Sequence, residues 1–356
     1  MRMTYIYTPT ILHKLAGKEK DAYIDFYLKA HRSYFYKELE HSIEHIAKEL
    51  TVEPPQSHFK HSVLVWDQDK VIAWGEFRYQ NDEKQTNSEY CEVDMKVDPQ
   101  YLRQGIGSEL MKQFVSLAEE HQKSMVEIWA NSYALDGVVP KLLDNLGMKK
   151  AVEESCNRLR REHINRDLLA KLPQYEEKLA QYHFQNLSRD EYLIKIIDDE
   201  AFRTESAEFL TEIVNLVPKG DSERADEKYT ASDLLARAKS DINNPKDGTF
   251  LLLWDKDKLI GYSATRFPKG DVRAVNTGLT GVRKKYQRQG IAMYLKLLMV
   301  KHYLQFDDFQ YIDTENAHTN VGMLKINEKL GFRTEFQWLW YEGKVAEIKT
   351  RLQKKM

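Results

Sequence analysis

The feature that most constrains the fold of this chain is an internal repeat. The segment WDQDKVIAWGEFRY (66–79) aligns without a gap to WDKDKLIGYSATRF (254–267), with identical residues at six of fourteen positions. Composition alone would give roughly one identical position. Further along, YLRQGIGSEL (101–110) matches YQRQGIAMYL (286–295) at nearly the same offset, and a third match around LGM and LGF follows in both halves. A period this long indicates a duplicated domain and not a solenoid of short repeats.

The two copies show the same order of expected strands and helices. An alternating hairpin is followed by a strand (Cys91–Val97 or Asn276–Val282), a glycine-containing turn and an amphipathic helix. The helix has apolar residues at positions 110, 114 and 117 in the first copy and at 295, 298 and 299 in the second. Another strand, a helix ended by Gly147 or Gly331, and a final strand complete each copy. This mixture predicts the α+β class.

The repeat predicts an N-terminal domain over residues 1–161 and a C-terminal domain over residues 191–356. Residues 162–190 carry leucine and tyrosine at helical spacing, interrupted by Pro173, so we expect a partly helical connector there. The polar run 218–233 is expected to be a mobile surface loop of the second copy, near the substrate entrance. In the final strand, FQWLWYE, the aromatic residues share one face and are expected in the core.

Charge and hydropathy exclude several classes of protein. The formal net charge is −2, with 53 basic and 55 acidic side chains, which argues against broad nucleic-acid binding. No run of about 18 apolar residues occurs, so no membrane segment is predicted. The only cysteines are Cys91 and Cys156, too few for a disulfide framework, which favours a reducing, cytoplasmic location. HSIEH (41–45) fits a metallopeptidase pattern but lacks a third ligand, and we predict no metal site.

The glycine turn has the properties of an anion site. A turn that leads into a helix leaves unpaired backbone N–H groups at the positive end of the helix dipole. Glycine removes the Cβ that would block a phosphate, and the neighbouring arginine adds charge. Neither copy has the Lys-Ser/Thr of a P-loop, and Leu110 and Leu295 stand where a dinucleotide motif would have its third small residue. The alternative is a helix start in which glycine only eases packing.

The complete arrangement resembles the GCN5-related N-acetyltransferase (GNAT) family over residues 60–150 and 245–345. That family has a central, mostly antiparallel sheet flanked by helices, and its motif Gln/Arg-x-x-Gly-x-Gly/Ala binds the pyrophosphate of acetyl-CoA. The second copy matches this motif in full from Gln287 to Ala292, whereas the first copy has Leu102 at the first position. The tandem duplication is similar to the mycothiol-synthase-like branch of the family, although mycothiol itself is not inferred as substrate.

The resemblance implies a coenzyme site chiefly in the second copy. Its expected contacts there are the strand end and turn, with an asparagine after the next strand: Leu279, Thr280, Gly281, Val282, Gln287, Arg288, Gln289, Gly290, Ile291, Ala292 and Asn320. The weaker first-copy set is Met95, Val97, Arg103, Gln104, Gly105, Ile106, Gly107 and Ser108. Asp136 replaces the asparagine in the first copy, where a carboxylate suits an anionic cofactor poorly.

The implied reaction is acetyl transfer to an amine of a small molecule or peptide. Many family members have a tyrosine acid four residues before the glycine of the LGF segment, but here Asn327 and Leu143 occupy that position. Asn327 is therefore a weak catalytic candidate. Glu92 and Asp94 share one strand face and are candidates for a base, with a solvated face as the alternative. An acyl-CoA-binding module without turnover, and a transferase that uses another acyl donor, both stay open.

Overall fold

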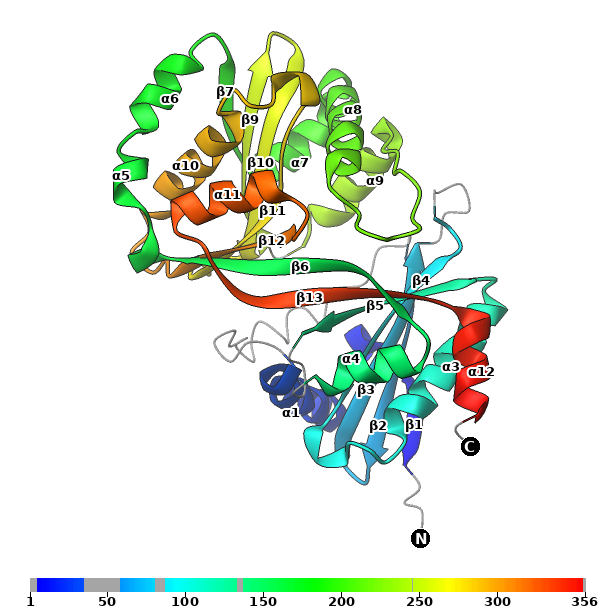
Figure 1. Cartoon of the computed structure of the whole chain (residues 1–356). Coiled ribbons are helices and arrows are strands. Elements are labelled where there is room, and N and C mark those ends of the chain that lie inside the picture. The colour runs from blue at the N-terminus through cyan, green and yellow to red at the C-terminus, as the bar shows by residue number, and fades with distance from the viewer. Residues whose placement is uncertain (1–4, 35–57, 81–86, 133–136, 245, 355–356) are drawn as a thin grey trace. The chain divides into compact units, whose positions relative to one another are not determined.

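The computed structural model describes residues 5–34, 58–80, 87–132, 137–244 and 246–354 (Figure 1). The chain forms two compact units. Unit 1 contains residues 1–153, 221–225 and 338–356, and unit 2 contains residues 154–220 and 226–337. Each unit is an antiparallel sheet with one parallel strand pair, covered by helices on both faces, which confirms the α+β prediction.

Unit 1 has the strand order β1-β2-β3-β4-β5-β13, in which only β4 and β5 are parallel. Its elements, in chain order, are β1 Ile6–Thr10, α1 Gly17–Tyr34, β2 His58–Asp67, β3 Lys70–Gln80, β4 Tyr90–Val97, α3 Ile106–Glu120, β5 Met125–Asn131, α4 Val138–Asn145, the second half of β13 (Arg333–Lys344) and α12 Val345–Lys354. Helices α3, α4 and α12 pack on one face of the sheet, and α1 packs on the other.

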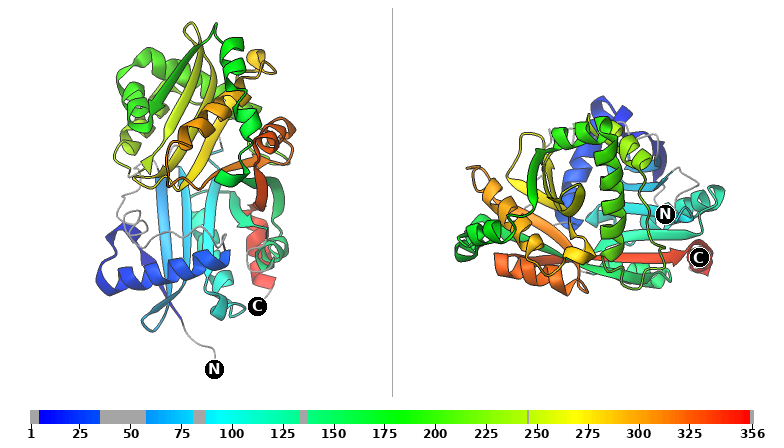
Figure 2. Two further views of the ribbon diagram at one scale, coloured as in Figure 1. Left: turned by 90° about the vertical axis from the view of Figure 1, so that its left-hand side faces the viewer. Right: turned by 90° about the horizontal axis from the view of Figure 1, so that it is seen from above.

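Unit 2 has the order β6-β12-β11-β10-β9-β7, in which only β11 and β12 are parallel. Its elements are β6 Lys149–Arg160, α5 Arg166–Leu169, α6 Leu172–Lys178, β7 His183–Ser188, α7 Arg189–Asp198, α8 Glu200–Leu216, α9 Ala231–Asp241, β8 Lys246–Asp247 (paired with β10), β9 Thr249–Asp255, β10 Lys258–Pro268, β11 Ala274–Val282, α10 Ile291–Tyr303, β12 Tyr311–Ala317 and α11 Val321–Leu330. Helices α7, α8 and α9 cover one face, and α10 and α11 the other (Figure 2).

The last strand of each repeat belongs to the sheet of the other repeat. β13 ends the second copy in sequence, yet Trp338–Lys344 pairs with β5 of the first copy. β6 ends the first copy, yet residues 154–160 pair with β12 of the second. The residues of a strand fix which face is apolar but not which neighbour it pairs with. The repeat pattern therefore did not reveal this exchange.

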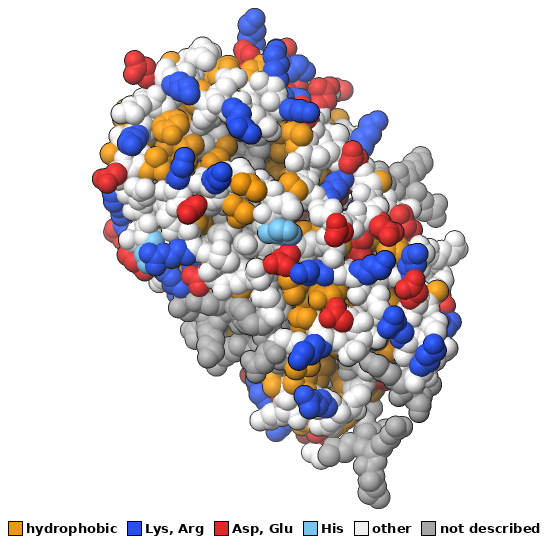
Figure 3. Space-filling view, in the orientation of Figure 1, with side chains coloured by type: hydrophobic (Ala, Val, Ile, Leu, Met, Phe, Trp, Pro, Cys, Tyr) orange, Lys and Arg blue, Asp and Glu red, His pale blue; other side chains and the backbone are white. Residues whose placement is uncertain are grey.

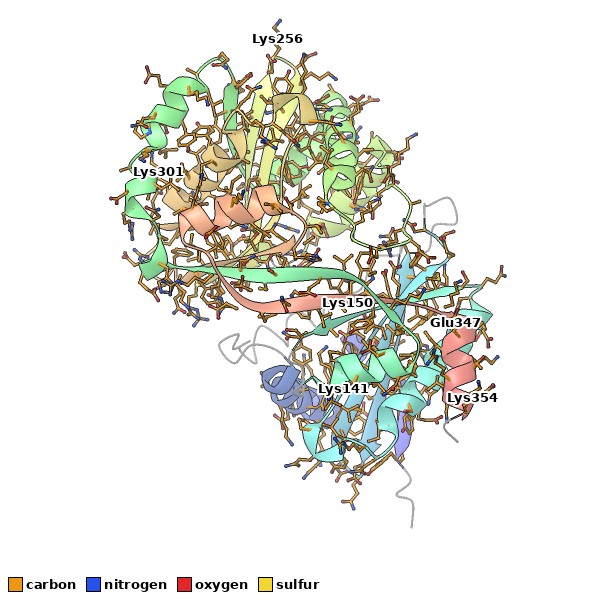
Figure 4. The ribbon with its side chains drawn as sticks, viewed as in Figure 1. Lys141, Lys150, Lys256, Lys301, Glu347 and Lys354 are labelled. Atoms are coloured by element: carbon orange, nitrogen blue, oxygen red, sulfur yellow. The ribbon has the colours of Figure 1, made fainter. Side chains whose placement is uncertain are left out.

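The repeat is also visible in the backbone of the two hairpins. Gln68 and Lys256 occupy the same place in the β2–β3 and β9–β10 turns, with φ of 55° and 57°. Lys256 marks the outer tip of its hairpin in Figure 4. On the face shown in Figure 3, basic and acidic side chains are interspersed, as the small net charge leads one to expect.

The structure refines three local expectations. In β13, Phe336 and Tyr341 are buried as expected, whereas Trp338 and Trp340 are only half-buried. In the connector, α5 ends at Leu169 and α6 begins at Leu172. Pro173 lies in the first turn of α6, where its missing N–H costs no helical hydrogen bond. The run 218–233 is not simply a loop of the second copy. It starts α9 at residue 231, and residues 221–225 pack within unit 1.

Candidate functional site: the strand splay and glycine turn

In both units the two parallel strands pair over only three residues and then separate; we call this separation the splay. β11 and β12 pair only at Ala274–Asn276, and β4 and β5 pair only at Tyr90–Glu92. Beyond Asn276 the described residues of β11 pair with β10 alone. The inner edges of the two strands then face each other without a ladder. Their backbone groups are available to a ligand that enters between them.

Strand β11 contains a β-bulge at this separation. Two residues, Gly278 and Leu279, lie opposite the single residue Ala264 of β10, and the ladder continues on both sides. In unit 1 the corresponding ladder runs without interruption from Ala73 to Arg78 of β3. A bulge turns backbone groups out of the ladder and re-aims them, and bulges are frequent beside active sites. The two units therefore differ where a ligand would meet the strand.

The turn after each of these strands has the same backbone conformation. Arg288 and Gly290 have φ of 65° and 94°, and their counterparts Arg103 and Gly105 have φ of 60° and 85°. Glycine occupies this left-handed region without the penalty of a Cβ. The first intrahelical bond of α10 runs from the Tyr294 N–H to the Gly290 carbonyl, at 2.9 Å. The N–H groups before Tyr294 therefore have no partner within the helix and point toward its positive end.

Two tyrosines hold the glycine turn of unit 2 in place by hydrogen bonds. The hydroxyl of Tyr286 donates to Asp255 in the hairpin at 2.8 Å, and that of Tyr182 donates to Gln289 at 3.1 Å. The rings of Tyr182 and Tyr286 meet edge to face, with centroids 6.0 Å apart. Together these contacts join the β9–β10 hairpin, the glycine turn and the residue just before β7. We call this set of contacts the frame of the turn.

Unit 1 repeats this frame with its own residues. Tyr101 donates to Asp67 at 2.8 Å, Tyr5 donates to Gln104, and the rings of Tyr5 and Tyr101 are 6.0 Å apart. The frame is therefore a property of the fold. It does not by itself distinguish a working site from a degenerate one.

Two of the predicted coenzyme residues have structural bonds of their own. The side-chain amide of Gln287 donates to the carbonyl of Val282 at 3.1 Å, which joins the turn to the strand end. Leu102 cannot make this bond in unit 1 and instead packs at the edge of the core. The side chain of Asn320 caps α11 by accepting from the Met323 N–H at 3.3 Å. Its first-copy counterpart, Asp136, and the HSIEH segment lie outside the described residues.

The remaining predicted residues lie along the same two strand ends and turns. Thr280 shares a hydrogen bond of 2.9 Å with Ser263, and Gly281 lies directly against Ile213 of α8. Arg288 and Arg103 are exposed, as a phosphate ligand requires. Gln104 and Gly105 are exposed as well. The other residues are half-exposed or buried at these strand ends and first helical turns: Leu279, Gln289, Ile291, Ala292, Met95, Val97, Ile106, Gly107 and Ser108.

None of the catalytic candidates forms an obvious proton-transfer group. Asn327 is buried, and its side-chain nitrogen donates to Asn316 at 2.6 Å. Leu143 is a core residue. Glu92 is ion-paired with Arg78, and Asp94 with Lys96 at 2.9 Å, so both carboxylates have structural partners on their strand face.

A carboxyl group that the repeat pattern did not reveal lies on β6 of unit 2, which pairs with the edge of β12 opposite β11. Burial and, to a smaller extent, the nearby carboxylate of Glu315 on β12 together raise the pKa of Glu154 on β6 to about 7. Cys156, the next residue of β6 on that face, pairs with Glu315 across the strands. A carboxyl group that titrates near neutral pH is suited to accept a proton from an amine. Its burial and the neighbouring Glu315, neither of which the sequence specifies, make its pKa unusual.

Among the described residues, no group of three or more His, Cys, Asp or Glu is placed to hold a metal ion. No described helix is long and apolar enough to span a membrane. Both cysteines are buried free thiols.

Comparisons with known proteins agree with this geometry. Residues 21–136 match the model described as the acetyltransferase (GNAT) family. The fold is similar to that of a tandem GNAT protein from the clavulanic acid biosynthesis pathway. The TM-score is 0.73 at 15% identity, over 96% of this chain and 99% of that one.

A GNAT protein from Sphaerobacter thermophilus is similar over 96% of both chains, with a TM-score of 0.64 and 13% identity. No curated protein sequence matches the chain. At these identities the solved structures establish the fold and not the substrate. Residues 21–136 therefore match the GNAT family, and the chain as a whole has the fold of tandem GNAT proteins.

Proposed function

We propose that the chain is an acetyl-CoA-dependent N-acetyltransferase whose coenzyme site lies chiefly in unit 2. The observation that carries this choice is the β-bulge at Gly278–Leu279, located where β11 leaves β12 and absent from the corresponding ladder of unit 1. The match of Gln287–Ala292 to the family motif supports the same choice.

The residues of the unit 2 turn fit an anionic group. Gly290 in its left-handed conformation leaves the first amides of α10 open, and the exposed Arg288 adds a positive charge. The turn would hold the pyrophosphate, and the backbone of Leu279–Val282 would hold the pantetheine arm. When bound, acetyl-CoA supplies an acetyl group activated as a thioester.

The acceptor amine must be neutral to attack a carbonyl carbon. Glu154, with its pKa raised to about 7 by burial and by Glu315, is suited to accept the amine proton near neutral pH. The hydrogen-bond donors nearest the thioester would be backbone N–H groups of β11 at the bulge, which would stabilise the developing oxyanion.

A coenzyme-binding module without turnover is the alternative function. It is favoured by Asn327, which stands where many relatives have a tyrosine acid and is bound to Asn316 in the interior. An amide cannot protonate a departing thiolate.

Release of free thiol from acetyl-CoA, followed with a panel of primary amines and basic peptides, separates the two functions. The transferase account predicts thiol release that depends on an amine. Propionyl-CoA in parallel tests the choice of acyl donor. Coenzyme binding without thiol release for any amine would support the binding module and contradict the transferase.

A further inference from the structure

The sheet face of unit 1 that lies away from α3 carries a row of three carboxylates. Glu92 of β4 pairs with Glu127 of β5, which pairs with Glu342 of β13. Glu127 and Glu342 are only 7% and 5% exposed. Neighbouring carboxylates with little access to water disfavour one another's ionised form. The row therefore requires positive partners.

The central carboxylate obtains its partner from outside the sheet. Arg78 on β3 is ion-paired with Glu92, but it also bonds Glu76 at 3.1 Å. Glu127 is bound at 2.8 Å by Nη2 of Arg224. Arg224 lies in the segment Asp221–Ala225, which belongs to none of the strands.

Aromatic rings form the walls around this guanidinium. Its central carbon lies 4.9 Å from the ring centroid of Tyr90 and 5.3 Å from that of Trp340. Trp340 is itself stacked on Trp129, with centroids 5.3 Å apart. A planar cation between aromatic faces and beside a carboxylate is the usual arrangement by which proteins recognise guanidinium groups.

Besides Arg224, the segment is held to unit 1 by exposed or half-buried hydrogen bonds. Ser222 donates to Glu342 at 2.6 Å, the Glu223 N–H donates to the same carboxylate at 3.3 Å, and the Ala225 N–H donates to the side chain of Asn87 at 2.9 Å. The Asp221 N–H donates to the Ala151 carbonyl at 2.8 Å, and the Asn87 side chain donates to the Ala225 carbonyl at 3.4 Å. Just outside the segment, Lys219 and Asp226 form an ion pair of 2.8 Å. Arg224 therefore lies in a short segment of the chain, and the Lys219–Asp226 ion pair joins the residues on either side of that segment.

In unit 2 the corresponding buried carboxylate is neutralised by an arginine of the same sheet. The counterpart of Glu127 on β12 is Asp313, and its cross-strand partner on β6 is Arg158. Arg158 binds both oxygens of Asp313 at 2.8 Å and lies 3.8 Å from the Tyr311 ring centroid. This arginine is fully buried and belongs to a strand. In unit 1 the strand position holds Glu342, so the cation must come from elsewhere.

The carboxylates of unit 1 are not fully satisfied by Arg224. Among the described residues, no hydrogen-bond partner reaches Oε2 of Glu127, although the side chain is more than nine-tenths buried and its other oxygen faces the guanidinium. Burial raises the pKa of Glu127 to about 7 despite Arg224, with Glu92 and Glu342 adding to the shift. The position retains capacity for a second hydrogen-bond donor.

We propose that Tyr90, Glu92, Glu127, Trp340 and Glu342 form a binding site for a guanidinium compound, the guanidinium niche, and that Arg224 fills it as an internal ligand. A free guanidinium compound competes with Arg224 and displaces residues 221–225. The niche lies in unit 1 and requires no coenzyme, so it goes beyond the proposed transferase function and does not rest on it.

The ligand is a guanidinium compound and not a simple ammonium ion for two reasons. The site offers two aromatic faces to a flat group, and the row of carboxylates can take donors from more than one edge of that group. An ammonium ion is a compact charge that would use the carboxylates but lose most of the stacking.

The test is calorimetric titration of the full chain with agmatine, and with putrescine as the ammonium counterpart, both without acetyl-CoA. We expect Arg224→Ala to bind agmatine at least about tenfold more tightly than wild type and about tenfold more tightly than it binds putrescine. Lys141→Ala, which removes an exposed cation of α4 elsewhere in unit 1, should bind as weakly as wild type. Arg224→Ala combined with Glu127→Gln should lose agmatine binding.

Agmatine binding should also raise the melting temperature of Arg224→Ala with increasing concentration, as any ligand specific for the folded state does. A folded Arg224→Ala protein that does not bind agmatine, or that binds putrescine equally well, would overturn the proposal. If Arg224→Ala does not fold, wild type decides: agmatine should accelerate amide hydrogen exchange in residues 221–225, and unchanged exchange at saturating agmatine would contradict displacement.

Discussion

The hydroxyl of Tyr286 donates to the carboxylate of Asp255 at 2.8 Å, and Tyr101 and Asp67 repeat this bond at the same distance in unit 1. The bond connects the turn before each anion-site helix to the tip of the preceding hairpin. The hydrogen bond raises the pKa of both tyrosines because the deprotonated phenol could not donate it. The repeat has thus preserved the support of the turn in both units.

Tyr286→Phe should weaken acetyl-CoA binding because it releases the turn from the hairpin without changing its charge. A neutral hydrogen bond contributes about 1 kcal/mol, so a loss of roughly fivefold in affinity is expected. Tyr101→Phe is the matched control, and it should leave affinity unchanged. Equal losses in both variants would show that both turns hold coenzyme.

Gly281→Ala tests the contact between β11 and α8. An added Cβ would lie 2.0 Å from Cγ2 of Ile213, a β-branched side chain that cannot turn away freely. We expect the free energy of unfolding to fall by about 1–3 kcal/mol. Gly278→Ala is the control, because its Cβ would meet the Ala264 carbonyl at an ordinary 3.7 Å. Truncation of Ile213 to alanine should restore part of the loss, as urea unfolding can measure, and no restoration would refute the steric explanation.

Lys296→Met should stabilise the protein. Lys296 is fully buried in α10, its Nζ has no hydrogen-bond partner among the described residues, and burial lowers its pKa to about 7. The equivalent residue of the first repeat, Met111, fills the same place in the core of unit 1. We expect a gain on the order of 2 kcal/mol at neutral pH.

The pH dependence of the protein's stability is a second test of the buried, neutral state of Lys296. Between pH 7 and the ordinary lysine pKa of 10.5, the unfolded chain binds more protons than the folded one. Wild-type stability should therefore rise with pH across this range, and the contribution of Lys296 to that rise should disappear in Lys296→Met. Identical pH profiles of melting temperature in the two proteins would contradict a neutral buried lysine.

If Glu154 accepts the amine proton, the pH profile of kcat/KM for acetyl transfer should rise through its pKa of about 7. Glu154→Gln should abolish this limb. Glu315→Gln should move it to lower pH, because the Glu315 charge raises the pKa of Glu154. A limb that persists in Glu154→Gln, or that stays in place in Glu315→Gln, would assign proton transfer to another group.

The sequence was sufficient for the fold class, the order of elements and the position of the turns, because these follow from local patterns that occur twice. Gly290, for example, was predicted at a helix start, and it is the residue directly before α10. The exchange of β6 and β13 could not be predicted, because a strand's alternation does not name its neighbour. The bulge at Gly278 and the pairing of Arg224 with Glu127 depend on cross-strand register and on contacts distant in sequence.

The most direct test of the central claim is calorimetric titration of acetyl-CoA into wild type, Arg288→Glu and Arg103→Glu. Both arginines are exposed, and both have the same left-handed backbone in equivalent turns. The two substitutions are therefore matched. The account predicts one main site, whose affinity falls by about tenfold or more in Arg288→Glu and is retained in Arg103→Glu. Loss of that site in Arg103→Glu, with full binding in Arg288→Glu, would place the coenzyme in unit 1 and contradict the account.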